Sequence, residues 1–451
     1  MVSHLSFKLT NKLALFIILA ISGIIVIDSN VINFSTYANK ELPITSKIWI
    51  FTIFSITFAT FAIILFKTIE SYDLTPNYKQ RKAKNLVRVA AVTSQFVVMA
   101  FLAVEIVQMG FVNMYNSNLT LLILFSSFVP SMMFIILLVL LLVRWFSSSK
   151  NFMIMAYAIS FSIVCIYLVL SIVYVNAQFT YTSEWIKAKS LHSTLVNSYV
   201  SELSSSFGVV LGMLSLLSFL LVWIATVALL RQYRNKIGRI RFWSIIMIPL
   251  IYFLFPFETY IADFTEGTLS GSPVIFTVIY IIFFSATNQV GGVLFSIVFL
   301  TTATKIKQPN LQNSLKISAV GMAVIFSSLE INSLLYAAYP PYGVLTIMLM
   351  PLGTYSLFTG LFASARLVSQ DKKLRKEFFQ SAEKQLAFLK TIGKVQMEKE
   401  LEKNLNSILK RSSILEESKD DYRDEENVKE LVQEVLEELR SKKSAVEKSD
   451  N

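Results

Sequence analysis

Apolar residues along this chain gather in blocks of about 20, separated by short polar segments. A helix rises about 1.5 Å per residue, so such a block crosses the roughly 30 Å hydrocarbon core of a bilayer. The fold expected from this pattern is all-α, a polytopic transmembrane bundle of about ten helices over residues 1–370. The predicted spans are 9–28, 48–66, 88–110, 119–143, 152–175, 207–230, 242–262, 273–300, 315–338 and 343–368.

The pattern changes after Arg366, where the chain becomes rich in Lys and Glu. Apolar residues then recur at the spacing of one helix face, first from Phe379 to Leu389 and from Leu401 to Ile408, and again from Val428 to Leu439. We therefore predict a cytoplasmic, amphipathic helical tail at residues 371–451. Its apolar stripes need a covering surface, which is either a cytoplasmic protein partner or a second copy of the tail in a coiled coil.

Composition excludes several other classes of protein. With 54% hydrophobic and 16% charged residues, the chain cannot be one soluble domain, because a globule of this size needs a polar surface. The chain has one cysteine, Cys165, and two histidines, too few for an ordinary His/Cys metal site. We expect no metal, no cofactor and no catalytic residue, since no phosphate-binding loop or hydrolase motif occurs. The chain is not expected to be an enzyme.

The net charge of +11 comes from the predicted membrane part, and its distribution indicates which loops lie on the cytoplasmic side. Residues 1–370 hold 23 Lys and Arg against 11 Asp and Glu, whereas residues 371–451 hold 18 against 19. With the N-terminus inside, 19 of those 23 basic residues fall on the inner side and 4 on the outer side. This distribution follows the positive-inside rule and predicts a cell-membrane protein with both termini cytoplasmic. It is not the footprint of a nucleic-acid-binding protein.

Acidic residues inside the predicted spans are the first candidates for function, because each costs roughly 2.5 to 3.5 kcal/mol on insertion scales. Glu105 lies in the third span, Glu258 in the seventh and Glu330 in the ninth, where Asn332 follows it. A buried carboxyl group can bind a cation or pass a proton. The alternative is a protonated side chain that joins helices through hydrogen bonds.

The eighth span contains a polar break at residues 287–292. Asn288 and Gln289 precede Gly291 and Gly292, and paired glycines weaken a helix and expose its backbone. Irregular backbone at the midplane is how many transporters coordinate ions and substrates. The alternative is a patch of small residues that lets two helices pack closely.

Two segments near the last span carry a resemblance. Tyr339, Pro340, Pro341, Tyr342 and Gly343 precede that span, and Ser369 to Lys376 follow it. They resemble the C-terminal part of uncharacterised multi-pass membrane proteins of ammonia-oxidising archaea. The resemblance covers the last quarter of the chain and implies a membrane location, with no known activity.

Two functions follow from this organisation. The first is a secondary transporter or permease for an ion or small solute, because five plus five spans give two halves of opposite orientation, as in inverted-repeat transporters. The second is a membrane sensor or scaffold that recruits a cytoplasmic partner through residues 371–451.

Overall fold

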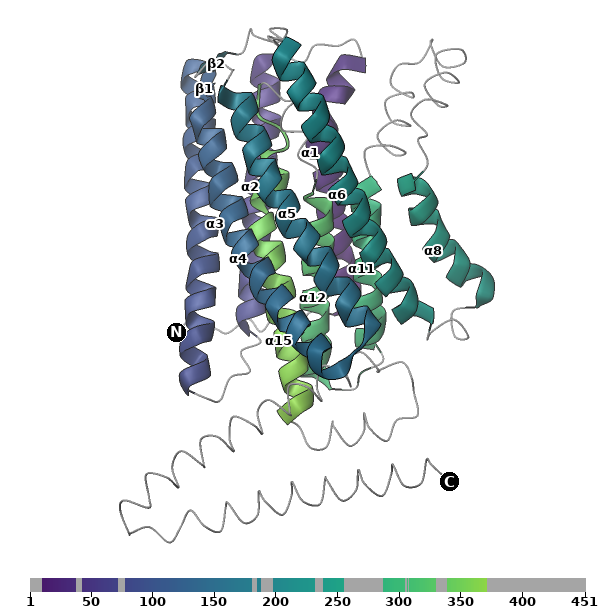
Figure 1. The fold of residues 1–451 in the computed structure, drawn as a ribbon. Helices are drawn as coiled ribbons and strands as arrows, with labels where there is room; N and C mark the ends of the chain where they lie inside the picture. The colour runs from purple at the N-terminus through teal and green to yellow at the C-terminus, as the bar shows by residue number, and fades with distance from the viewer. Residues whose placement is uncertain are drawn as a thin grey trace, which may run out of the picture. The chain divides into compact units, whose positions relative to one another are not determined.

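The computed structural model describes residues 10–37, 43–71, 78–180, 185–187, 198–231, 238–254, 287–304, 306, 308–329 and 339–370. Over these residues the chain is almost entirely helical, and long helices run side by side in a bundle (Figure 1). The predicted tail at 371–451 lies outside the described residues. Its two helices therefore stay predictions, as does the total of ten spans.

Within the described residues, seven helical segments are long and apolar enough to cross a membrane, so the chain is a multi-pass membrane protein. They match predicted spans one to six and span ten. Their bounds are α1 Asn11–Tyr37, α2 Ile44–Ser71, α3 Tyr78–Val112, α4 Ser117–Ser149, α5 Phe152–Thr180, α6 Ser198–Arg231, and the pair α14 Val344–Met348 and α15 Met350–Gln370.

Predicted spans seven to nine are described only in part. Helix α8 covers Arg239–Leu254, α11 covers Thr287–Thr304 and α12 covers Pro309–Ser327. The ninth span was predicted to run without interruption over 315–338, but α12 ends at Ser327 and the next two residues are not helical. Helix α12 therefore ends inside the predicted ninth span.

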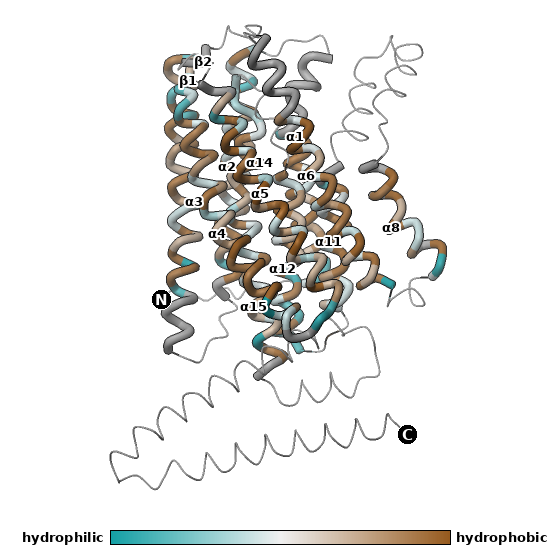
Figure 2. The backbone as a smooth tube through the Cα atoms, in the orientation of Figure 1, coloured by the Kyte–Doolittle hydropathy of each residue, from teal (hydrophilic) through white to brown (hydrophobic). Residues whose placement is uncertain are grey.

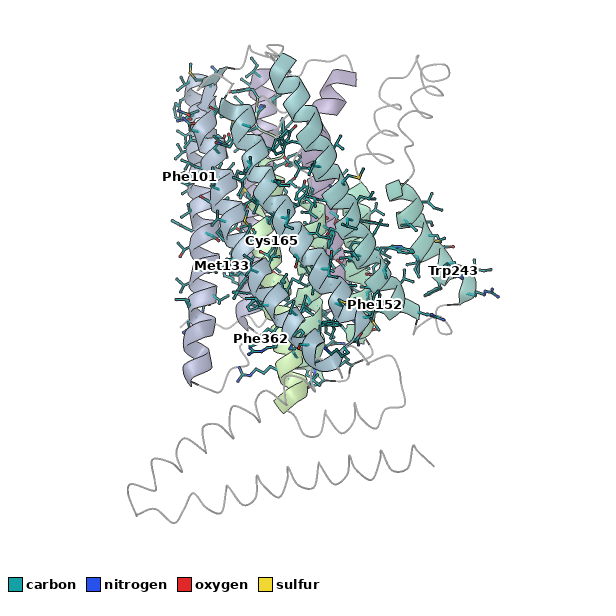
Figure 3. The ribbon with its side chains drawn as sticks, in the orientation of Figure 1. Phe101, Met133, Phe152, Cys165, Trp243 and Phe362 are labelled. Atoms are coloured by element: carbon teal, nitrogen blue, oxygen red, sulfur yellow. The ribbon has the colours of Figure 1, made fainter. Side chains whose placement is uncertain are left out.

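The surface of the bundle is apolar, as the brown outer faces of the helices show (Figure 2). Large side chains stand exposed along the helices, among them Phe96 at 74% and Phe111 at 85% of their full accessible area. Trp243 on α8 and Phe152 on α5 are further exposed examples (Figure 3). Exposed apolar surface of this extent would be unstable in water, so lipid is the solvent of these faces.

Polar side chains inside the helices are mostly satisfied within their own helix. Thr52, Ser55 and Thr68 in α2 each donate to the carbonyl oxygen four residues earlier, at 2.7 to 2.8 Å. The same bond recurs in α15 from Ser364 to Gly360. Such bonds let serine and threonine enter the membrane without leaving a polar group unpaired.

Helices α12 and α15 form the centre of the bundle. In an 18-residue window of Val344–Val368, 89% of the residues are buried, compared with 28% in such a window of Ile44–Ile69 on the periphery. Glycines bring the two central helices together: a Cβ atom on Gly321 would lie 2.5 Å from the backbone nitrogen of Leu357 and 2.7 Å from the carbonyl oxygen of Gly353. Close approach of backbones through small residues is how helices associate in a membrane.

Two short strands lie at the end of the bundle where α3 ends and α4 begins. β1 Met114–Asn116 pairs antiparallel with β2 Trp185–Lys187, with Tyr115 opposite Ile186. The sequence analysis did not predict them. Their pairing links the turn between α3 and α4 to the segment that follows α5.

Candidate functional site

The structure describes only part of the predicted site. Glu258, Glu330 and Asn332 lie outside the described residues, and Asn288 lies in the first turn of α11, where only the backbone is described. The side chains of Gln289 and Glu105 are described, and both are buried. They contact different residues, so they do not form one site with each other.

The C-terminal end of α12 is the first polar cluster, made of Ser22, Gln289, Ser327, Ser328 and Leu329. We call this set the α12 terminus. The Nε2 atom of Gln289, on α11, lies 3.5 Å from the carbonyl oxygen of Ser327. The hydroxyl of Ser22, on α1, lies 3.4 Å from that of Ser327. Polar groups from three helices therefore meet where α12 stops.

A fourth helix contributes a strong hydrogen bond to the same end. The hydroxyl of Tyr167, on α5, donates to the carbonyl oxygen of Leu329 at 2.5 Å. The last carbonyls of any helix lack partners within the helix and carry a partial negative charge. Tyr167 and Gln289 supply donors to carbonyls that would otherwise be unsatisfied in an apolar interior.

Gly292 explains how α11 comes this close to α12. A Cβ atom at position 292 would lie 2.9 Å from the carbonyl oxygen of Ala323 and 3.2 Å from the hydroxyl of Ser327. Only glycine allows that approach. The predicted polar break in span eight thus lies against the predicted ninth span. The contact of Gly292 supports close helix packing, and the contact of Gln289 with Ser327 supports a polar site.

The second polar cluster fixes the turn from Tyr339 to Gly343, which leads into α14. Asp28, fully buried at the end of the apolar part of α1, accepts hydrogen bonds from the backbone nitrogen of Gly343 and the hydroxyl of Thr346, both at 3.1 Å. Gly343 has a φ of +89°, in the left-handed region that glycine adopts without strain. The carboxyl of Asp28 therefore joins α1 to the start of the last span.

Two tyrosines of this turn anchor it to other helices. Tyr342 donates its hydroxyl to the carbonyl oxygen of Lys47 at 2.9 Å, and Tyr339 donates to that of Met109 at 3.3 Å. Burial raises the pKa of Tyr339 to about 12 and also raises the pKa of Tyr342. Both hydroxyls hence stay protonated at neutral pH and remain donors.

Glu105 belongs to a neighbouring group at the same end of the bundle. Its Oε1 atom accepts a hydrogen bond from Thr120 at 2.6 Å, which ties α3 to α4. Close by, the ring of Tyr115 stacks on that of Tyr339, with centroids 6.0 Å apart. The hydrogen bond to Thr120 is what the helix-joining interpretation of Glu105 predicts.

Sequence reasoning missed Asp28 and Tyr167 as members of these clusters. Asp28 had a detectable feature, since it is a lone acid that closes the apolar run of the first span. Tyr167 had none, because a tyrosine in an apolar span is ordinary. Within the described residues, no group of three or more His, Cys, Asp and Glu lies close enough together to hold a metal ion.

The two clusters differ in what they can do chemically. The group around Asp28 and Glu105 joins helices to one another at one end of the bundle. The α12 terminus presents backbone and side-chain oxygens inside the bundle and can interact with a cation or a polar solute. Comparisons with protein-family models, with curated proteins and with solved structures found no match for this chain.

Proposed function

We propose that the protein is a secondary transporter or permease for an ion or small solute, located in the cell membrane. The observation that carries this proposal is the end of α12 at Ser327 within an apolar bundle, lined by Ser22, Gln289 and Tyr167. Non-helical backbone at membrane depth is tolerated only where it is buried in protein or lines a cavity. In many transporters, the C-terminal ends of helices inside the membrane are where ions bind.

Glu330 is the principal ion-linked residue in this proposal. It follows Leu329 directly in the sequence, and Asn332 follows two residues later. A carboxyl group can alternate between a protonated state and a cation-bound state, and coupled transport requires a group with these two states. In this proposal Glu105 has a structural role instead, because the hydrogen bond between its Oε1 atom and Thr120 ties α3 to α4.

Flux measurements in reconstituted vesicles test the proposal. Purified protein is inserted into vesicles that enclose a pH-sensitive or Na⁺-sensitive dye, and gradients of H⁺, Na⁺ and K⁺ are applied in turn. Glu330→Gln keeps the shape of the side chain and removes its titration, so we expect the protein to fold and ion-dependent flux to be lost. Glu105→Gln is the matched control and should retain flux. If Glu330→Gln left every measured flux intact, Glu330 would have no role in transport.

The orientation in the membrane is part of the same proposal. The ratio of 19 inner to 4 outer basic residues supports cytoplasmic N- and C-termini. The resemblance to uncharacterised membrane proteins of ammonia-oxidising archaea supports a membrane location and adds nothing on activity.

The alternative function is a membrane sensor or scaffold that recruits a cytoplasmic partner. Its support is the sequence of residues 371–451, whose apolar stripes need a covering surface. In the full-length protein, Val432→Asp and Val435→Asp together should abolish self-association or recovery of one specific partner, measured by crosslinking and co-purification. Gln433→Asp, between the two stripe positions, is the control. Unchanged association in the double variant would remove the main support for this function.

A further inference from the structure

We propose that the α12 terminus is a binding site for a monovalent alkali cation. This inference rests on the proposed function, because it names the class of ion taken by the same site. It is argued only from Ser22, Gln289, Ser327, Ser328 and Leu329, all of which the structure describes.

The residues of the site are rich in neutral oxygen ligands. Ser327 contributes its carbonyl oxygen and its hydroxyl, Ser22 a second hydroxyl and Leu329 another carbonyl oxygen. Ser328 is 2% exposed, and its hydroxyl has no hydrogen-bond partner in the part of the chain that the structure describes. A buried hydroxyl without a partner is costly, so this group indicates a further ligand.

The carbonyl oxygen of Leu329 accepts a short hydrogen bond from Tyr167, whereas the two oxygens of Ser327 make only long contacts. The contacts of Ser327 with Gln289 and Ser22 measure 3.5 and 3.4 Å, beyond the usual 2.9 Å or so for N–H···O and about 2.7 Å for O–H···O bonds. In contrast, hydroxyls elsewhere in the bundle bond at normal length, for example Ser160 to the carbonyl oxygen of Ser218 at 2.9 Å. Carbonyl and hydroxyl oxygens that do not saturate each other can replace the hydration shell of a cation.

The charge of the site selects a monovalent ion. None of the five residues carries a formal charge, and the end of a helix supplies only about half a negative charge. The proposed function adds a single carboxyl group, that of Glu330, so the negative charge available to a cation is at most about 1.5. Divalent Ca²⁺ and Mg²⁺ are bound chiefly through carboxylates, whereas carbonyl and hydroxyl oxygens together with a helix C-terminus suit Na⁺ or K⁺. An anion would be repelled by the same carbonyl groups.

Ion-dependent thermal stability of the full-length protein in detergent tests the site without requiring transport. We expect the melting temperature to be higher in NaCl or KCl than in choline chloride at equal ionic strength, since a ligand that binds the folded state stabilises it. Ser328→Ala should weaken the apparent affinity for the cation by about tenfold, which corresponds to ~1.4 kcal/mol. Ser22→Ala provides a second test if Ser328→Ala does not fold.

Ser364→Ala is the matched control. Ser364 is also fully buried, but its hydroxyl bonds to Gly360, which packs against Ser314 and Ser318 in the first half of α12. Nine residues of helix separate Ser318 from Ser327, a distance of about 13 Å. This variant should keep the cation response of the parent protein.

The possible failures are distinguishable. Equal melting temperatures in NaCl, KCl and choline chloride, or an undiminished response in Ser328→Ala and Ser22→Ala, would overturn the cation site. Flux that needs neither Na⁺ nor K⁺ would also overturn it, while leaving the proposed permease intact. Stabilisation by Na⁺ or K⁺ without any flux in vesicles would support the site and overturn the proposed function.

Discussion

Replacing Gly321 by alanine would place a methyl group against the backbone of α15. The new Cβ atom would lie 2.5 Å from the nitrogen of Leu357 and 2.7 Å from the carbonyl oxygen of Gly353. Non-bonded heavy atoms pack at about 3.5 to 4.0 Å, so α12 and α15 would have to separate by roughly 1 Å. Neither of the nearest atoms belongs to a flexible side chain that could move aside.

The size of the effect follows from two opposing contributions. Extra volume in a well-packed interior costs about 1–3 kcal/mol. Alanine is the better helix former by about 0.8–1.0 kcal/mol, which offsets part of that cost. The free energy of unfolding of the Gly321→Ala protein should therefore be lower than that of the parent protein by up to about 2 kcal/mol, because the overpacking cost is the larger contribution.

Gly212→Ala in α6 is the control, since a Cβ atom there would meet nothing within 4 Å. Only the gain in helix propensity applies to this variant, so its stability should be unchanged or rise by up to about 1 kcal/mol. The free energy of unfolding of both variants would be measured in detergent or in bilayer discs. If Gly321→Ala were as stable as Gly212→Ala, the close packing of α12 on α15 described above would be refuted.

Three further predictions concern single residues and the topology. Asp28→Ala should lower the free energy of unfolding by about 1–3 kcal/mol, because two buried donors lose their acceptor, whereas Asp28→Asn keeps an acceptor and should cost less. Thr120→Val should lower the free energy of unfolding by about 1–3 kcal/mol, because the buried carboxyl group of Glu105 loses the hydroxyl that donates to it. In a Cys165→Ser background, Thr45→Cys should react with an impermeant maleimide on intact cells and Lys150→Cys only after permeabilisation; the reverse pattern would contradict the predicted orientation.

The sequence by itself determined the helices that the structure describes most fully. Apolar blocks located the membrane-spanning segments of α1 to α6 and the last span to within about four residues of each end, and these seven segments confirm that part of the prediction. The helices α1, α3 and α6 themselves extend up to ten residues further at one end. This works because every backbone polar group inside lipid must be satisfied within its own segment, which leaves a long apolar block little choice but a helix. Glycine and proline next to the last span likewise marked its turn.

Only the tertiary structure decided which polar groups meet. Asp28 bonds to Gly343 across 315 residues of sequence, and Tyr167 bonds to Leu329 across 162. Local hydropathy holds no information about such pairs, since it depends on neighbours along the chain and not on which helices pack together. The end of α12 at Ser327 was hidden for the same reason, because the apolar run continues past a break that polar groups on α1, α5 and α11 stabilise.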